Sequence, residues 1–214
     1  PAIPRRLQIK LRNHQAKSIS RRCREFWPIS ASAAAPPPYW EGWKDQKQFA
    51  LILTHDVDTQ RGYRNLFQLM QIDREMGFVS AFNFVPEKRY VVYEKDLQKI
   101  KESGFEIGVH GLCHDGKLLQ SESTFNKRAK KINHYLEKWG ACGFRAPAMH
   151  HDLELFKRLD IRYDASTFDT DPYEPQSDGA NTIFPFYIPD DYGKIAYWEL
   201  PYSLPQDKIG RAHV

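Results

Sequence analysis

Short apolar runs alternate with amphipathic segments along most of the chain. The runs that predict strands lie at 49–54, 79–85, 106–110, 143–146, 162–166 and 196–200. Between them, apolar residues recur at helical spacing within 63–76, 94–103, 123–139 and 152–159. An alternation of strands and helices predicts a mostly parallel sheet with helices outside it.

The lengths of these elements narrow the fold class. The predicted helices are short and the strands are many, which favours an α/β barrel, incomplete at the C-terminus, over an open doubly wound sheet. No Gly-x-Gly-x-x-Gly sequence and no phosphate loop follows the first predicted strand. Nucleotide binding is therefore disfavoured.

Composition is typical of one globular domain. The chain has 214 residues, of which 41% are hydrophobic and 14% aromatic. Residues 1–46 form a basic arm that ends in a Pro-rich linker, and the body of the domain spans 47–208. The last six residues, 209–214, resemble the translation of a sequencing adapter, so we predict a non-native tail there and a longer natural protein.

Charge and cysteine content exclude several function classes. The net charge is only +4, and the basic residues of the arm suit a solvated surface better than nucleic acid. No run of about 18 apolar residues predicts a membrane span. The three cysteines are too scattered for a disulfide framework or a cysteine-based zinc site. The sequence leaves the oligomeric state open. It slightly favours the cytoplasm as compartment, with secretion or the cell envelope as alternatives.

Acidic and imidazole side chains follow two of the predicted strands. Asp56 and Asp58 come after the first run, and His110 and His114 after the third. The carboxyl ends of parallel strands are where α/β folds place their chemistry. Residues two apart in extended chain point to one side, and a helical turn would bring the two histidines together. Carboxylate plus two imidazoles suits Zn²⁺, Co²⁺ or Ni²⁺.

Each of these pairs also has an ordinary structural interpretation. The two aspartates are suited to cap the next helix, and the histidines to lie in a polar loop. Cys113, between the histidines, is expected to be a packed residue rather than a ligand. The coincidence of both pairs at strand ends favours a metal site.

Later strands end in further candidates. Arg145 is suited to orient a carboxylate through a bidentate contact, and Asp164 to serve the same group. Trp198 and Tyr202 fit either a sugar-binding wall or ordinary core packing.

The order of these motifs resembles that of the polysaccharide deacetylases, the NodB-homology or carbohydrate esterase family 4 group. Thr54-His-Asp-Val-Asp58 is similar to their Thr-Phe-Asp-Asp motif, and His110-Gly-Leu-Cys-His114 to their His-Ser/Thr-x-x-His motif. Arg145-Ala-Pro147 matches Arg-x-Pro, and Asp164-Ala-Ser166 matches Asp-x-Ser. The resemblance spans residues 49 to 207.

The resemblance implies a distorted (β/α)7 barrel and hydrolysis of N- or O-acetyl groups on carbohydrates. It implies that Asp56 is the catalytic base, oriented by Arg145, with Asp164 as a further catalytic residue. Asp58, His110 and His114 become the metal ligands. Its substrate site would include Pro147, Trp198 and Tyr202.

The chain departs from the family pattern at several positions. Val57 separates the two aspartates, His55 replaces an aromatic hydrocarbon, and Gly111 replaces a hydroxyl residue. No segment matches the family's Leu-x-x-His motif, which carries the general acid, so we expect that segment beyond the end of this sequence and the fragment to be catalytically impaired.

Two other functions on the same fold remain open. One is hydrolysis of a small cyclic amide, as in allantoinases, which share an Asp-Val-Asp/Glu motif. The other is an inactive relative that only binds carbohydrate. Nucleic-acid binding through the basic arm would leave the order of the motifs unexplained.

Overall fold

The computed structural model describes residues 31–167 and 180–203, together with Leu11, His14, Ser18 and Arg21. Its contacts divide the chain into two units. One comprises Tyr39–Ser166 and Phe186–Leu200 and contains all the strands and the longer helices described below. The other comprises Pro1–Pro38, Thr167–Pro185 and Pro201–Val214, and its described part includes the 3-10 helix η1 (Ala31–Ala34).

A seven-stranded sheet forms the centre of the larger unit. Its order is β1-β2-β3-β4-β5-β7-β6, all neighbours are parallel except β6 with β7, and the described strands do not close into a barrel. The strands are β1 (Thr54–Val57), β2 (Ala81–Phe84), β3 (Glu106–His110), β4 (Gly143–Arg145), β5 (Tyr163–Asp164), β6 (Phe186–Pro189) and β7 (Ile195–Glu199). The expected parallel α/β architecture is confirmed.

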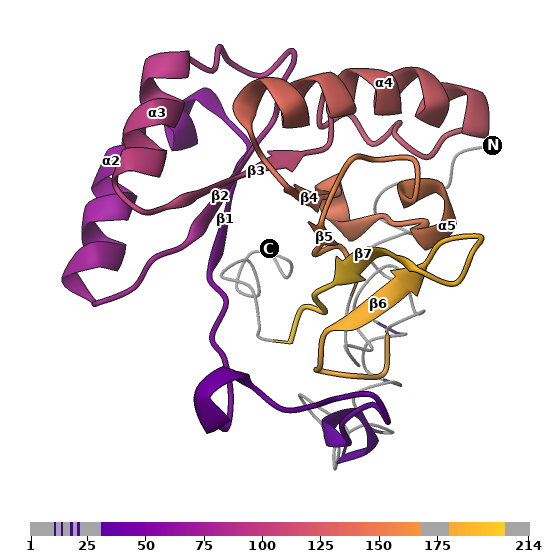
Figure 1. The fold of residues 1–214 in the computed structure, drawn as a ribbon. Helices are drawn as coiled ribbons and strands as arrows, with labels where there is room; N and C mark the ends of the chain where they lie inside the picture. The colour runs from indigo at the N-terminus through magenta and orange to yellow at the C-terminus, as the bar shows by residue number, and fades with distance from the viewer. Residues whose placement is uncertain are drawn as a thin grey trace. The chain divides into compact units, whose positions relative to one another are not determined.

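Helices connect successive strands and cover one face of the sheet. They are α2 (Gln60–Glu75), α3 (Glu94–Glu102), α4 (Glu122–Trp139) and the short α5 (Leu153–Phe156). The 3-10 helices η2 (Lys44–Gln46) and η3 (Pro147–Met149) lie before β1 and after β4. In Figure 1, α2 and α3 lie side by side next to β1 and β2, while α4 runs across beyond β3 and β4.

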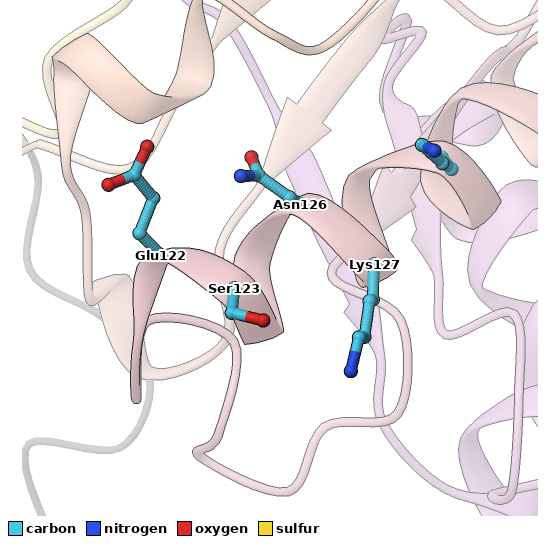
Figure 2. Close-up of a pocket in the computed structure, with 5 residues that line it drawn as sticks. Glu122, Ser123, Asn126 and Lys127 are labelled. Carbon is cyan, nitrogen blue, oxygen red and sulfur yellow. The ribbon is translucent and has the colours of Figure 1, made fainter.

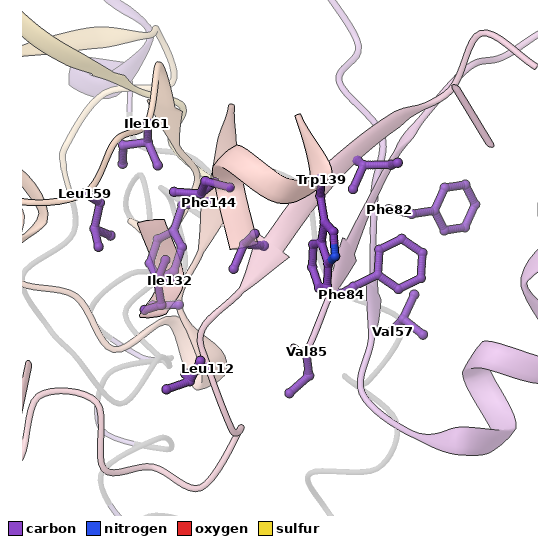
Figure 3. Packing of buried hydrophobic residues seen from close by; sticks show 14 of the residues in the cluster. Val57, Phe82, Phe84, Val85, Leu112, Ile132, Trp139, Phe144, Leu159 and Ile161 are labelled. Carbon is purple, nitrogen blue, oxygen red and sulfur yellow. The ribbon is translucent and has the colours of Figure 1, made fainter. Parts of the chain in front are cut away.

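The core lies between the sheet and these helices. Along β2, Phe82 and Phe84 turn toward the helices, and the ring of Phe84 meets Trp139 of α4 edge to face at 6.3 Å. Figure 3 shows these rings with Ile132 and Phe144 in one continuous cluster. Because side chains alternate along a strand, the residues between them point to the opposite face.

That opposite face is polar. In the strand register, the residues that share it are Thr54, Asp56, Ala81, Asn83, Glu106, Gly108, His110, Gly143, Arg145, Tyr163, Tyr187 and Trp198. It carries few of the buried hydrophobic side chains that make up the core. The sheet therefore separates an apolar helix side from a side that bears the predicted chemistry.

The first predicted strand is wrong in position. The run 49–53 is not strand, and Phe49, Leu51 and Ile52 are 76%, 47% and 54% exposed. The register pairs Thr54 with Ala81, the first residue of β2, so the residues before Thr54 extend past the end of the neighbouring strand. Hydrophobicity alone does not report where a partner strand begins.

Other boundaries also differ from the expectations. The predicted helix over 152–159 shortens to α5, whose N-cap Asp152 accepts from the N–H of Leu155. The antiparallel strand β6 was not predicted, since a four-residue strand that ends at Pro189 gives little periodicity. Among the described residues, no helix is long and apolar enough to cross a membrane.

Candidate metal centre and catalytic site

Three potential metal ligands converge at the carboxyl ends of β1 and β3. Asp58 follows β1 directly, His110 is the last residue of β3, and His114 lies four residues further on. One carboxylate oxygen of Asp58 lies 3.2 Å from Nε2 of each histidine. The three donor atoms all lie within 4.8 Å of one another. Of the described residues, these three alone form such a group of histidine, cysteine or acidic side chains.

Backbone contacts orient the buried histidine. His110 is 2% exposed, and its Nδ1 lies 2.9 Å from the backbone carbonyl of Arg145, across the β3–β4 pairing. That contact places a proton on Nδ1, so Nε2 is the ring nitrogen that would bind a metal. A hydrogen bond of this kind on the far nitrogen is typical of metal-binding histidines.

His114 reaches the cluster through a bend, so the expected helical turn is wrong. Residues 111–116 form no helix, and His114 has a left-handed backbone with φ 49°. Arg89 donates a 2.6 Å hydrogen bond to its carbonyl oxygen. Gly111 also has positive φ, and a Cβ there would lie 2.6 Å from the ring of Pro147. A left-handed residue other than glycine costs of order 1–3 kcal/mol and is concentrated at functional sites.

Asp58 and the two histidines shift each other's pKa values. Burial alone would raise the pKa of Asp58, but hydrogen bonds from His110 and His114 outweigh it and hold that pKa far below its usual range. The hydrogen bond to Asp58 in turn raises the pKa of His114. Asp58 is therefore a carboxylate at neutral pH, which is the form that binds a metal.

The residues present fit a divalent cation. One carboxylate oxygen and two imidazole nitrogens make an N/O set with the three-ligand count of catalytic zinc sites, in which a water or substrate takes the fourth position. Cys113 is 5% exposed, packs in the apolar core and does not belong to the ligand group. Asp58 is also not the helix cap, because the Thr59 side chain caps α2 by accepting from the N–H of Gly62.

Asp56 lies beside the cluster but is held by different partners. One of its oxygens accepts a 2.9 Å hydrogen bond from Nδ2 of Asn83, and the other lies 3.6 Å from Nε of Arg145 and 3.9 Å from Nε2 of His110. Arg145 is 4% exposed and also donates to the hydroxyl of Thr54. The predicted neighbourhood of Asp56 and Arg145 is thus present, as a single long contact rather than a bidentate pair.

Two residues of this site were missed in the sequence. Asn83 sits in the apolar run of β2, where a lone amide is the one polar residue among aromatics. Tyr90 donates to the carbonyl of Val57, between the two aspartates, and accepts from the N–H of Val85. Its burial raises the pKa of the phenol. No short motif marks Tyr90, because its partners are the last residue of β1 and the residue that follows β2.

A cavity of about 270 Å³ opens next to His114. It is lined by Leu112, Cys113, His114, Asp115, Gly116, Lys117, Leu118, Leu119, Gln120, Arg128, Pro147 and His150. Two of its lining residues are joined, because Arg128 donates two hydrogen bonds of 2.6 and 2.8 Å to Asp115. Pro147, predicted to contact substrate, is part of this lining.

A second hollow lies on the exposed side of α4. Figure 2 shows that Glu122, Ser123, Asn126 and Lys127 project from one stretch of this helix. Because the lining comes from a single helix, no groups converge there from different elements. This hollow is a solvated helix face.

The remaining predicted site residues lie elsewhere. Asp164 is fully buried, accepts from the hydroxyl and N–H of Ser166 and pairs with Glu199. Its predicted catalytic role, like the substrate contacts of Trp198 and Tyr202, stays a prediction. The ring of Trp198 meets Tyr187 at 5.9 Å, and the N–H of Tyr202 donates to the carbonyl of Thr167.

Comparison with known proteins shows a likeness of structure alone. No protein-family model and no curated protein sequence matches the chain. A protein from Mycobacterium smegmatis assigned as a polysaccharide deacetylase superposes with a TM-score of 0.57 at 20% identity, over 79% of this chain and 63% of that one. The chain thus spans less than two thirds of that protein's length.

Two further structures match less closely. The allantoinase PuuE gives a TM-score of 0.48 at 15% identity, over 65% of this chain and 44% of that one. A family 4 carbohydrate esterase from Streptomyces lividans, solved with acetate, gives 0.43 at 11% identity, over 54% and 60%. Only the Mycobacterium smegmatis protein has a TM-score above 0.5 among these three, and the likeness shows that this chain shares the fold of that polysaccharide deacetylase.

Proposed function

We propose that this protein is a metal-dependent hydrolase that removes acetyl groups from a carbohydrate. The observation that carries the proposal is the convergence of Asp58, His110 and His114, from two different strands, on the polar side of a deacetylase-like sheet. A capping role or an ordinary polar loop gives no reason for three donor atoms to meet within 4.8 Å. Zn²⁺ is the proposed metal, with Co²⁺ or Ni²⁺ as substitutes.

The proposed ligands and the proposed base are distinct carboxylates. Asp58 is the ligand, because its oxygen faces both imidazoles at 3.2 Å. Asp56 stands 3.9 Å from His110 and has its other oxygen occupied by Asn83, which suits a base beside the metal rather than a ligand. When bound, the cation would act as a Lewis acid and lower the pKa of a bound water to roughly 7.

In the proposed reaction, Asp56 accepts a proton from water at the oxygen that faces Arg145. Arg145 stabilises the carboxylate form and restricts its rotation, because the guanidinium is buried and also tied to Thr54. Attack of that water on the acetyl carbonyl carbon and cleavage of the bond to the sugar's nitrogen or oxygen release acetate, and the proton taken up by Asp56 passes to the leaving nitrogen or oxygen. Proximity and general-base help of this kind contribute roughly 10²–10⁴-fold.

The cavity beside His114 is the proposed sugar-binding region. Its position next to the ligands would place a bound acetyl group near the cation, and Pro147 lies at the boundary between the two. We propose Trp198 and Tyr202 as further substrate contacts and Asp164 as a supporting residue. The substrate is an acetylated glycan.

The test is acetate release from a panel of acetylated substrates by the zinc-loaded chain, with the metal-stripped chain alongside. The panel comprises N-acetylated chitooligosaccharides, peptidoglycan fragments and acetylated xylan, with allantoin as the competing substrate. We expect zinc-dependent acetate release from at least one glycan and no loss of allantoin. Hydrolysis of allantoin without acetate release would replace the proposal by the cyclic-amide alternative.

A matched pair of histidine variants separates the site from nonspecific effects. His110→Ala removes a buried ligand, while His134→Ala removes an exposed histidine of α4. We expect the first to lose zinc and activity together and the second to retain both. Zinc binding by the unmodified chain without release from any substrate, including an activated aryl acetate whose leaving group needs no general acid, would leave the metal site standing and reject the hydrolase.

A further inference from the structure

A buried amide stands beneath the proposed base. Asn83 is the third residue of β2, is 3% exposed, and lies on the polar side of the sheet between two phenylalanines that face the helices. Its Nδ2 donates to Asp56 at 2.9 Å. A buried polar side chain in the middle of an apolar strand is costly unless its hydrogen bonds are satisfied.

The neighbouring strand makes room for this amide. Gly108 of β3 is the register partner of Asn83, and a Cβ added there would lie 2.0 Å from Oδ1 of Asn83. The glycine has no positive φ that would call for it on conformational grounds. Glycine within a strand weakens it, and a close approach of another group is a recognised reason for its presence. The side chain of Asn83 therefore occupies the volume that a larger residue at 108 would fill.

The same geometry orients Asp56. With Oδ1 held by Asn83, the plane of the carboxylate is fixed and Oδ2 is directed toward Arg145 and His110, at 3.6 and 3.9 Å. Arg145 alone cannot do this, because its contact with Asp56 is long and its guanidinium also bonds to Thr54 and lies against the sulfur of Met149. A carboxylate with only one restrained oxygen would be free to turn its other oxygen toward the cation.

We propose that Asn83, seated over Gly108, is a positioning residue that holds Asp56 off the metal and presents one of its oxygens as the base. This assignment rests on the proposed function of the site and adds a specific mechanism for keeping two nearby carboxylates in different roles. Asp58 is left as the acidic ligand, and Asp56 stays available to water. The pair Asn83–Gly108 makes this possible because neither residue works without the other.

Two single substitutions test the pair independently. Asn83→Leu removes the donor and keeps a side chain of the same branching, and Gly108→Ala keeps Asn83 but forces its amide away from Asp56. Each is expected to lower kcat about 10- to 100-fold with KM changed less than about 3-fold, because the loss falls on the proton-transfer step. The double variant is expected to lose no more than the worse single variant, since both break one hydrogen bond.

Control substitutions of the same chemical kind lie outside the site. Asn133→Leu removes an amide on α4 that bonds to the backbone near Arg158, and Gly62→Ala adds a methyl group in α2 where the nearest atom is 3.6 Å away. We expect both controls to keep kcat. Equal losses of kcat in the controls and in the site variants would overturn the proposal.

A structural readout decides the matter without any assay. In crystals of the unmodified chain, Asp56 should accept from Asn83, and in Asn83→Leu and Gly108→Ala its carboxylate should rotate away from that position. With Co²⁺ bound, rotation onto the metal should raise the coordination number and weaken the visible absorption. An unchanged Asp56 orientation in both variants would overturn the inference, whereas failure of the unmodified chain to release acetate would count against the proposed function alone.

Discussion

This protein contains two pairs of neighbouring acidic residues that differ in burial and in the groups that surround them. Asp56 and Asp58 lie at the end of β1 on the polar side of the sheet, half-exposed and facing imidazoles and a guanidinium. Asp164 and Glu199 are paired in register on β5 and β7, both fully buried, on the side that Phe144 shares. Neighbours, not residue type, decide what each pair does.

The pKa values express this difference. Hydrogen bonds from two histidines outweigh burial and lower the pKa of Asp58. Burial and the adjacent carboxyl of Glu199 raise the pKa of Asp164 well above its usual value, although Ser166 donates to it. Two carboxyl groups that accept from the same N–H, that of Ser166 at 3.2 and 3.1 Å, oppose each other's ionisation, which favours a proton on Asp164. The first pair is built to bind a cation and the second to retain a proton.

The largest expected effect separates the pairs by metal affinity. Asp58→Asn should weaken zinc binding by more than about 100-fold, because a neutral amide is a poor ligand and the site loses its one negative charge. Asp164→Asn should leave zinc affinity within about 3-fold, because Asp164 does not contact the ligand group. Competition titration with a chromophoric chelator measures both. Equal losses would mean that the two pairs form one site.

A second prediction separates the roles of Asp56 and Asp58. Asp56→Asn should lower kcat roughly 10²–10⁴-fold, the range of a lost general base, and should change zinc affinity less than about 10-fold. Asp160→Asn, on the surface before β5, is the matched control. Loss of zinc from the Asp56 variant would reverse the roles of the two aspartates.

The sequence predicted which residues lie at the polar end of the sheet. It did not predict the loop geometry that brings His114 to them. The mostly parallel sheet and the placement of His110 and Arg145 at strand ends follow from hydrophobic periodicity, because parallel strands present their carboxyl ends at one edge. The bend that brings in His114 depends on the left-handed backbone at that residue, which no periodicity reports.

Residues whose role depends on a partner in another strand could not be identified from the sequence. Asn83 is informative only once β2 is known to lie between β1 and β3, and Gly108 only once it is known to face Asn83. Glu199 likewise reads as an ordinary end of a strand until register places it beside Asp164. The displacement of β1 to Thr54–Val57 has the same origin, since strand limits are set by pairing.

The smallest predicted effect concerns the pH dependence of stability. Asp164 keeps its proton in the fold at pH values where the unfolded chain, with a pKa near about 3.9, has lost it. The folded state then binds more protons, so the free energy of unfolding falls as pH rises above about 4. Glu199→Gln keeps an acceptor for Ser166 and removes one acid, so it should raise stability at pH 8 by about 1–3 kcal/mol and less at pH 5.

Chemical denaturation at the two pH values measures this change. Glu137→Gln, an exposed glutamate near the end of α4, serves as the control and should show no such dependence. Greater destabilisation by Glu199→Gln at pH 8 than at pH 5 would show that the charge of Glu199 stabilises the fold rather than opposing Asp164, and would remove the contrast between the two acidic pairs.

The central claim is that Asp58, His110 and His114 hold one cation. X-ray absorption spectroscopy of the zinc-loaded chain tests it directly, because imidazole gives characteristic outer-shell scattering and sulfur a distinct shell near about 2.3 Å. The account predicts two imidazole nitrogens with oxygen donors and no sulfur, and loss of one imidazole in His114→Ala. A zinc–sulfur distance, or an unchanged spectrum in that variant, would contradict it.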